Sequence, residues 1–243
     1  PIVGSSVWTG AEIAQSARWI RQLPDGMSEA LTKAAAVALA SGRPWSQVTR
    51  EAFDVPGLAA FAASVREELE NGSGMVKITG LDISQVDPAA FRHLWYGLGL
   101  HLGTILSQTW DGLMMKAIQD EGYETAVATH GATKDASGQA FLSSGARTLT
   151  NGPLRFHTDR CDVVGLFCIG QAARGGDSRL CSTGALHNAI LQRRPDLLEV
   201  LYQPIPRTRF GEEKGGLDSI YYLPIFGVRD GRLTSHYSRT YIE

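Results

Sequence analysis

The sequence predicts an α+β protein with a jelly-roll architecture that begins with a group of helices. Two observations favour this fold class. Apolar residues recur at helical spacing through residues 1–72, and many short strand patterns with interspersed helices follow. This mixture suits a jelly roll better than a parallel sheet built of repeated βαβ units. We therefore expect an N-terminal helical region at 1–72 and a strand-rich core at 73–243.

Three helices are predicted in the N-terminal region. The first covers residues 11–23 and ends at a Pro-Asp-Gly turn. The second is capped by Ser28 and runs through the alanine-rich stretch 34–40. The third starts at Pro56 and stops at the Asn-Gly pair 71–72. We expect these helices to pack against a sheet through their apolar faces.

The pattern changes in the middle of the chain. Residues 75–80 form a short strand pattern that ends in glycine, and an Asp-Pro pair opens a helix at 87–98. Residues 113–118 are a further strand candidate. The stretch 119–153 is rich in Gly, Thr, Ser and Asp and is weakly periodic, which is typical of a long functional loop.

The second half contains the clearest strand patterns. Residues 163–169 are continuously apolar and predict a buried strand, and 178–181 predict the strand that returns after a glycine turn. Ser182 caps one helix and Pro195 begins another. Shorter strands are expected at 204–209, 221–226 and 233–237.

Composition describes an ordinary globular chain and narrows the functional classes. Its 243 residues are 43% apolar and 20% charged, with a formal net charge of −2 and no basic stripe, so we expect no nucleic-acid partner. The longest apolar run, 34–40, is too short for a membrane span, and no signal peptide is recognisable. Three cysteines are too few for a disulfide framework and suit a reducing compartment, so we expect a cytoplasmic protein with no membrane partner.

His157-Thr158-Asp159 is the motif that carries chemistry. Side chains two positions apart in a strand point to the same face, so His157 and Asp159 can present a nitrogen and an oxygen to one metal ion. A second histidine would complete a 2-His-1-carboxylate set, which leaves positions open at Fe(II). The alternative is a solvated loop histidine beside a turn aspartate. Cys161 would share the same face in a regular strand, or would be a small buried apolar residue.

Several motifs together resemble a known family. A strand ending in glycine at 75–80 and a helix ending at 98–103 precede the H-x-D. Gly175-Gly176-Asp177-Ser178 and a Ser/Thr-capped helix follow it at a characteristic distance. In this order the motifs resemble the TauD/TfdA family of Fe(II)- and 2-oxoglutarate-dependent dioxygenases over roughly residues 73–243.

This resemblance implies a double-stranded β-helix (a cupin-like jelly roll) with iron bound by His157, Asp159 and a distal histidine. It implies 2-oxoglutarate and O2 as co-substrates, with the far carboxylate of 2-oxoglutarate held by a late arginine and by the hydroxyl of Ser178. Ser178 could instead bond local backbone in its turn. The implied reaction is oxidation, above all hydroxylation, of a C–H bond in a small polar molecule such as an amino acid or organic acid, with release of succinate and CO2. A homo-oligomer is a further expectation by family analogy.

The third iron ligand is not evident in the sequence. His187 lies in a predicted helix, where a packing or surface role is expected. His236 is a candidate by spacing, and Arg239 follows it closely. By resemblance, 231–243 is the segment that precedes the distal motif of the family. We therefore expect the third ligand and the last strands of the core to lie beyond Glu243.

Other interpretations of the same residues remain open. A lyase, isomerase or hydrolase on a similar jelly roll could bind another divalent ion at His157 and Asp159. A non-catalytic binding protein with an incomplete metal site is the alternative outside enzymes. Arg207 and Arg209 could bind an anionic substrate, or could be exposed or paired with Glu212 and Glu213. The sequence does not identify the substrate.

Overall fold

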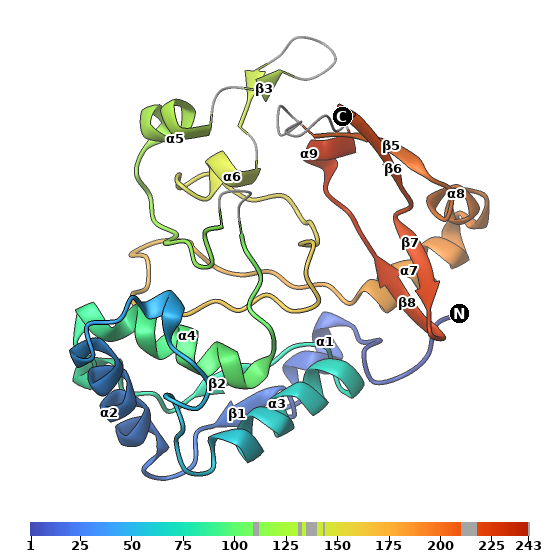
Figure 1. Cartoon of the computed structure of the whole chain (residues 1–243). Coiled ribbons are helices and arrows are strands. Elements are labelled where there is room, and N and C mark those ends of the chain that lie inside the picture. Colours follow the sequence, from blue (N-terminus) through green and yellow to red (C-terminus); the bar gives the residue numbers. More distant parts are fainter. Residues whose placement is uncertain (109–111, 131–132, 135–139, 143, 210–217, 243) are drawn as a thin grey trace.

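The computed structural model describes residues 1–108, 112–130, 133–134, 140–142, 144–209 and 218–242. These residues form a mixed α+β structure, as predicted, in which the strands pair as four two-stranded sheets. Figure 1 shows the N-terminal helices grouped on one side and the C-terminal strands β5 to β8 on another, with long irregular connections between them. Within the described residues the strands do not close into a barrel.

The N-terminal part is a packed helical core. Helices α2 (Met27–Ala40), α3 (Leu58–Asn71) and α4 (Phe91–Leu102) confirm three predicted helices. The prediction that Ser28 caps α2 was wrong, because the helix begins at Met27 after Gly26 and has no side-chain cap. Their apolar faces meet in one cluster that includes the fully buried Leu94. Helix α4 packs in this cluster although it lies after residue 72, where the helical region was expected to end. The boundary between the two expected regions remains a prediction. Single 3-10 turns precede α3 and α4, at Trp45–Gln47, Ile83–Gln85 and Pro88–Ala90.

The predicted first helix at 11–23 was wrong over most of its length. Helix α1 spans only Gly10–Ala14, where Thr9 and Glu12 form a capping box. Strand β1 (Ile20–Gln22) then pairs in parallel with β2 (Lys77–Thr79), which confirms the strand predicted at 75–80. The backbone of β1 is thus satisfied by a partner far along the chain, and this pairing overrides local helix propensity.

The middle of the chain also differs from expectation. Residues 113–118 do not form the predicted strand, and Met114 and Met115 pack against the helical core. Within 119–153, which the sequence predicts as a long loop, the structure contains short regular elements. These are α5 (Tyr123–His130), β3 (Thr133–Lys134), β4 (Ala140–Phe141) and α6 (Ser144–Arg147).

The C-terminal part confirms most of its predicted elements. Helices α7 (Thr183–Arg193) and α8 (Pro195–Leu201) begin where predicted, with Ser182 as the N-cap of α7. Two antiparallel hairpins follow, and a short helix ends the described chain. The elements are β5 (Ile205–Thr208) with β6 (Ile220–Leu223), β7 (Phe226–Arg229) with β8 (Arg232–Ser235), and α9 (Arg239–Ile242).

His187 has the packing role that was expected. It is buried on α7, its Nε2 lies 2.9 Å from the Tyr202 hydroxyl, and its ring stands edge-on to Phe226. The neighbouring Asn188 accepts a hydrogen bond of 2.7 Å from the backbone N–H of Ile2. This contact fastens the start of the chain to the C-terminal part, beside β7 and β8 in Figure 1.

The strands predicted at 163–169 and 178–181 were wrong. Both segments are irregular, and most of their large apolar side chains are exposed, including Leu166 and Leu180 at 66% and 65%. Phe167 is the exception, because it is half-buried and its ring stacks on Trp95 of α4 at 5.4 Å. A continuous apolar run forms a buried strand only where neighbouring strands pair with it and another layer covers it. No described strand pairs with either segment, and α4 covers only the part around Phe167.

None of the helices in the described part of the chain has both the length and the apolar character needed to cross a bilayer.

Candidate functional site

The H-x-D motif is fixed to the segment that follows β8. The backbone N–H of Thr158 donates to the Tyr237 carbonyl at 2.7 Å, and the Tyr237 N–H donates back to the Thr158 hydroxyl at 2.8 Å. His157 and Ser238 form an isolated antiparallel bridge beside these bonds. Thr158, the middle residue of the motif, therefore determines which part of the chain lies next to His157 and Asp159.

The structure brings His157 and Asp159 together, with the His157 Nε2 lying 3.9 Å from the Asp159 Oδ1. The His157 Nδ1 lies 2.7 Å from the Arg155 carbonyl oxygen, which can only accept, so Nδ1 carries the proton. In a neutral ring Nε2 then keeps its lone pair, and that is the tautomer a metal ligand requires. An imidazole nitrogen and a carboxylate oxygen so arranged fit an Fe(II) ion.

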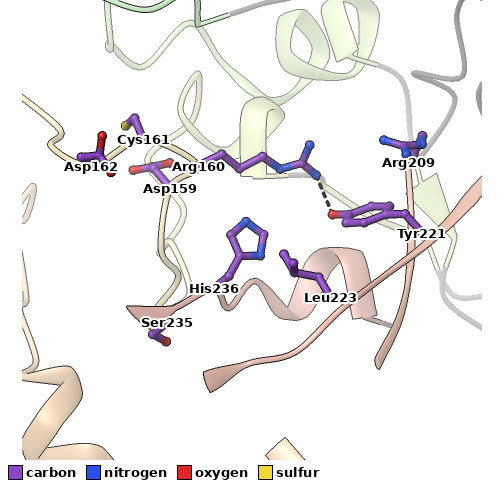
Figure 2. A pocket seen from close by; sticks show the side chains of 9 residues that line it. All are labelled: Asp159, Arg160, Cys161, Asp162, Arg209, Tyr221, Leu223, Ser235 and His236. Atoms are coloured by element: carbon purple, nitrogen blue, oxygen red, sulfur yellow. Dashed lines mark hydrogen bonds between the residues drawn. The ribbon is translucent and has the colours of Figure 1, made fainter. Parts of the chain in front are cut away.

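Beside this pair is a pocket of about 500 Å³, which Figure 2 shows from close by. Acidic and thiol groups lie at one end of it, and basic and aromatic groups at the other. Its lining consists of Asp159, Arg160, Cys161, Asp162, Arg209, Tyr221, Leu223, Ser235 and His236.

The basic end of the pocket is built around Tyr221 on β6. Arg160 donates to the Tyr221 hydroxyl at 2.7 Å, and its guanidinium lies 5.3 Å from the centre of the Tyr221 ring. Arg209 lies 4.7 Å from the same ring centre and donates from Nε to the Asp218 carbonyl at 2.8 Å. Cation–π contacts of this kind hold two like charges near one aromatic side chain.

His236 reaches the same pocket from the end of β8. Its Nδ1 lies 2.9 Å from a guanidinium nitrogen of Arg207, whose side chain is buried. Burial lowers the pKa of His236, and the positive charges of Arg207 and Arg160 lower it further. The ring is therefore held neutral at neutral pH.

Cys161 lines the acidic end of the pocket and is partly buried. Burial raises the pKa of the Cys161 thiol, and the Asp159 carboxylate raises it further.

Two further residues were candidates for the site, Ser178 for 2-oxoglutarate and His236 for the metal ion. Ser178 is exposed in an irregular segment and does not line the pocket, because the turn at Gly175 and Gly176 leads into chain without strand partners. His236 is in the pocket, yet the described residues contain no group of three or more His, Cys, Asp or Glu that could hold one metal ion. The roles of Ser178 and of a third ligand stay predictions.

The structure adds residues that the sequence did not indicate. Arg160 directly follows the H-x-D motif, and this adjacency was the only signal that could have identified it. Tyr221 had no signal, because its contact with Arg160 spans 61 positions of the chain. Arg207 and Arg209 were expected to be exposed or to bind an anion, and Arg207 proves to be 1% exposed. Glu212 and Glu213 lie outside the described residues.

The α+β fold and the paired imidazole and carboxylate beside a pocket define a candidate metal-dependent enzyme. Comparison with known families gives the narrower class. The family described as "Taurine catabolism dioxygenase TauD, TfdA family" matches residues 40–238, and the chain belongs to this family. Its members are typically Fe(II)- and 2-oxoglutarate-dependent oxygenases, so the predicted resemblance is confirmed.

Two curated proteins are similar to this chain. FR-33289 synthase of Streptomyces rubellomurinus (strain ATCC 31215) is 28% identical over 237 residues, which cover 98% of this chain and 66% of that protein. The taurine hydroxylase-like protein SAT17 of Stachybotrys chartarum (strain CBS 109288 / IBT 7711) is 28% identical over 193 residues, which cover 77% of this chain and 46% of that protein. The chain thus spans between about half and two thirds of the length of these relatives.

Proposed function

We propose that the chain is a non-haem Fe(II)- and 2-oxoglutarate-dependent dioxygenase that hydroxylates a C–H bond of a small polar molecule. The observation that supports this most directly is the His157 and Asp159 pair, with 3.9 Å between Nε2 and Oδ1. We further propose that the family's double-stranded β-helix is the framework for this site. Family membership supports both proposals, and one relative is described as taurine hydroxylase-like, which supports hydroxylation as the outcome.

His157 and Asp159 would hold the iron. A neutral imidazole and one carboxylate leave Fe(II) with one formal positive charge, which attracts an anionic, chelating co-substrate. When bound, Fe(II) with 2-oxoglutarate and O2 supplies the oxidising chemistry that yields succinate, CO2 and a hydroxylated product.

The chain's own residues position these groups. Arg155 fixes the His157 tautomer through its carbonyl, and Thr158 holds the motif against Tyr237. The pocket beside Asp159 is the place for the target molecule, and its polar lining favours a small polar substrate over an apolar one.

Succinate release tests the proposal. The chain is purified anaerobically, supplied with Fe(II), 2-oxoglutarate and O2, and assayed across a panel of amino acids and small acids. We expect succinate that depends on iron and O2 and that rises with at least one panel member. Turnover of a panel member without O2 uptake would instead indicate a metal-dependent lyase, isomerase or hydrolase, and a complete lack of succinate would count against an oxygenase.

A further inference from the structure

Segment 154–181 is packed against the helical core at Phe167. The Phe167 ring is half-buried and stacks on that of Trp95 in α4, with 5.4 Å between the ring centres and 14° between the ring planes. Phe91 of the same helix meets Phe167 edge-on at 6.1 Å. Stacked and edge-on arrangements are the favourable geometries for aromatic pairs, so this contact holds the segment more firmly than its exposed side chains do.

Gly165 brings the backbone of the same segment against Trp95. A Cβ atom added at Gly165 would lie 2.7 Å from Cζ2 of the Trp95 ring. Carbon atoms pack at about 3.5–4.0 Å, so a residue with a side chain at this position would push the segment away from α4. The Trp95 ring therefore packs on the Phe167 side chain and also on the backbone two residues before it.

The second half of the H-x-D motif lies between this contact and the hydrogen bonds of Thr158. Thr158 is bonded to the segment after β8, and Gly165 follows it seven positions later. An extended chain of seven residues reaches no more than about 25 Å. Within this span 158–165, Asp159, Cys161 and Asp162 line the pocket. Their positions therefore depend on both ends of the span, one bonded to the C-terminal part and the other packed on the helical core.

We propose that Trp95 is a positioning residue for the iron site. It does not line the pocket, and it acts through Gly165 and Phe167, whose packing against α4 limits where the Asp159 carboxylate can lie. This proposal rests on the function proposed above, and it extends the support of the site to the helical core. Without the Trp95 contact, span 158–165 is held at one end only, so Fe(II) should bind more weakly although both ligands are present.

Two glycine-to-alanine substitutions in the same segment test the proposal. Gly165→Ala adds a methyl group where Trp95 leaves no room, whereas Gly170→Ala adds the same group where no atom lies within 4 Å. The thiol of Cys161 is the local reporter, because it is partly buried in span 158–165 and reacts with iodoacetamide faster when it is more exposed. Peptide mass spectrometry separates its alkylation rate from those of the two exposed cysteines.

Gly165→Ala should raise the alkylation rate of Cys161 about threefold or more and should weaken Fe(II) binding about tenfold, as loss of a supporting contact around a metal site does. Gly170→Ala should change neither quantity. Trp95→Leu should have the same two effects, and adding Gly165→Ala to it should cause little further change, because the ring that the methyl group meets is gone. Phe167→Tyr keeps the stacked ring and should behave as the wild type, whereas Phe167→Leu should resemble Trp95→Leu.

The proposal would be overturned if Gly165→Ala and Gly170→Ala had equal effects on the Cys161 alkylation rate, or if neither changed it. It would also be overturned if the wild-type chain bound Fe(II) and Gly165→Ala bound it as tightly. Urea denaturation of each variant establishes that it is folded under the assay conditions. A wild-type chain that bound no Fe(II) or formed no succinate would refute the oxygenase, while the alkylation rates would still decide the role of Trp95, so the two failures are distinguishable.

Discussion

The helical core around α2, α3 and α4 and the segment 154–181, which carries the H-x-D motif, differ in how they are held. In the helical core, large apolar side chains such as Leu94 and Phe53 are completely buried. In segment 154–181, Leu166, Ile169 and Leu180 are exposed, and no helix or strand forms. The motif itself is fixed mainly by hydrogen bonds between Thr158 and Tyr237.

The helical core is therefore the main source of stability, whereas segment 154–181 carries the residues for the chemistry. Burial of apolar area is the main favourable contribution to folding, and the helical core supplies most of it here. A segment with few buried contacts and a handful of hydrogen bonds belongs to the less stable part of a structure. Substitutions in the core should therefore change stability, whereas substitutions at the motif should change binding.

The largest expected effect on stability is at Leu94. Leu94→Ala removes three heavy atoms from a fully buried site and should reduce the free energy of unfolding by about 3 kcal/mol. Leu166→Ala is the matched change in segment 154–181, where the side chain is 66% exposed, and should cost less than about 0.5 kcal/mol. Urea denaturation measures both. Equal losses would show that segment 154–181 is packed as tightly as the core.

A smaller effect is expected at Glu68, a buried acid on α3. Its Oε1 accepts from the Ser73 N–H at 2.8 Å and from the Ser73 hydroxyl at 2.7 Å, and Arg21 lies 3.2 Å from its other oxygen. Burial would raise the pKa of Glu68, but the Ser73 hydrogen bonds and the charges of Arg21 and Arg18 outweigh it, so that the pKa is lowered.

A lowered carboxyl pKa stabilises the fold above the ordinary glutamate pKa of about 4.3, and this contribution is lost as the pH falls through the lowered value. Glu68→Gln should cost about 1–2 kcal/mol at pH 7 and should make unfolding less dependent on pH in the acid range. The exposed Glu67 on the same helix provides the control, Glu67→Gln. If the free energy of unfolding depends on pH in the same way in both variants, Glu68 is not the carboxyl group that causes the pH dependence in the acid range.

The smallest effect is expected at Thr158. Thr158→Val keeps the shape of the side chain but leaves the Tyr237 N–H without its acceptor, and should cost about 1 kcal/mol of unfolding free energy. It should also weaken metal binding, because the motif loses its fixed position. Thr32→Val in the helical core is the control. It removes a hydroxyl that donates to the Ser28 carbonyl within the same helix, and it should leave metal binding unchanged. A loss of metal affinity in both variants would contradict a positioning role for Thr158.

Local patterns predicted the fold where local contacts determine it. Helices α2, α3, α7 and α8 follow from apolar periodicity within each element, and α7 also has its predicted cap, Ser182. The helix predicted at 11–23 was wrong because β1 is determined by its pairing with β2, which lies more than fifty positions away. The strand predicted at 163–169 was wrong because burial depends on what covers a segment, and its own residues do not encode that.

The functional site likewise combines features that the local sequence predicts with contacts between distant segments that it does not. The two-residue spacing of His157 and Asp159 was enough to predict that their side chains meet, although the motif does not lie in a regular strand. The contact between Thr158 and Tyr237 spans 79 positions, and the contact between Arg207 and His236 spans 29. Neither contact leaves a pattern in the local sequence, so the pocket and its basic end emerge only from the structure.

The central claim is that His157 and Asp159 bind Fe(II) in a form that accepts 2-oxoglutarate. Anaerobic addition of Fe(II) and 2-oxoglutarate to the chain, followed by visible absorption, tests it most directly. We predict a weak charge-transfer band that His157→Ala and Asp159→Ala abolish and that Asp162→Asn, a change to the neighbouring pocket carboxylate, leaves in place. No band with the wild-type chain, or a band that survives His157→Ala, would contradict the claim.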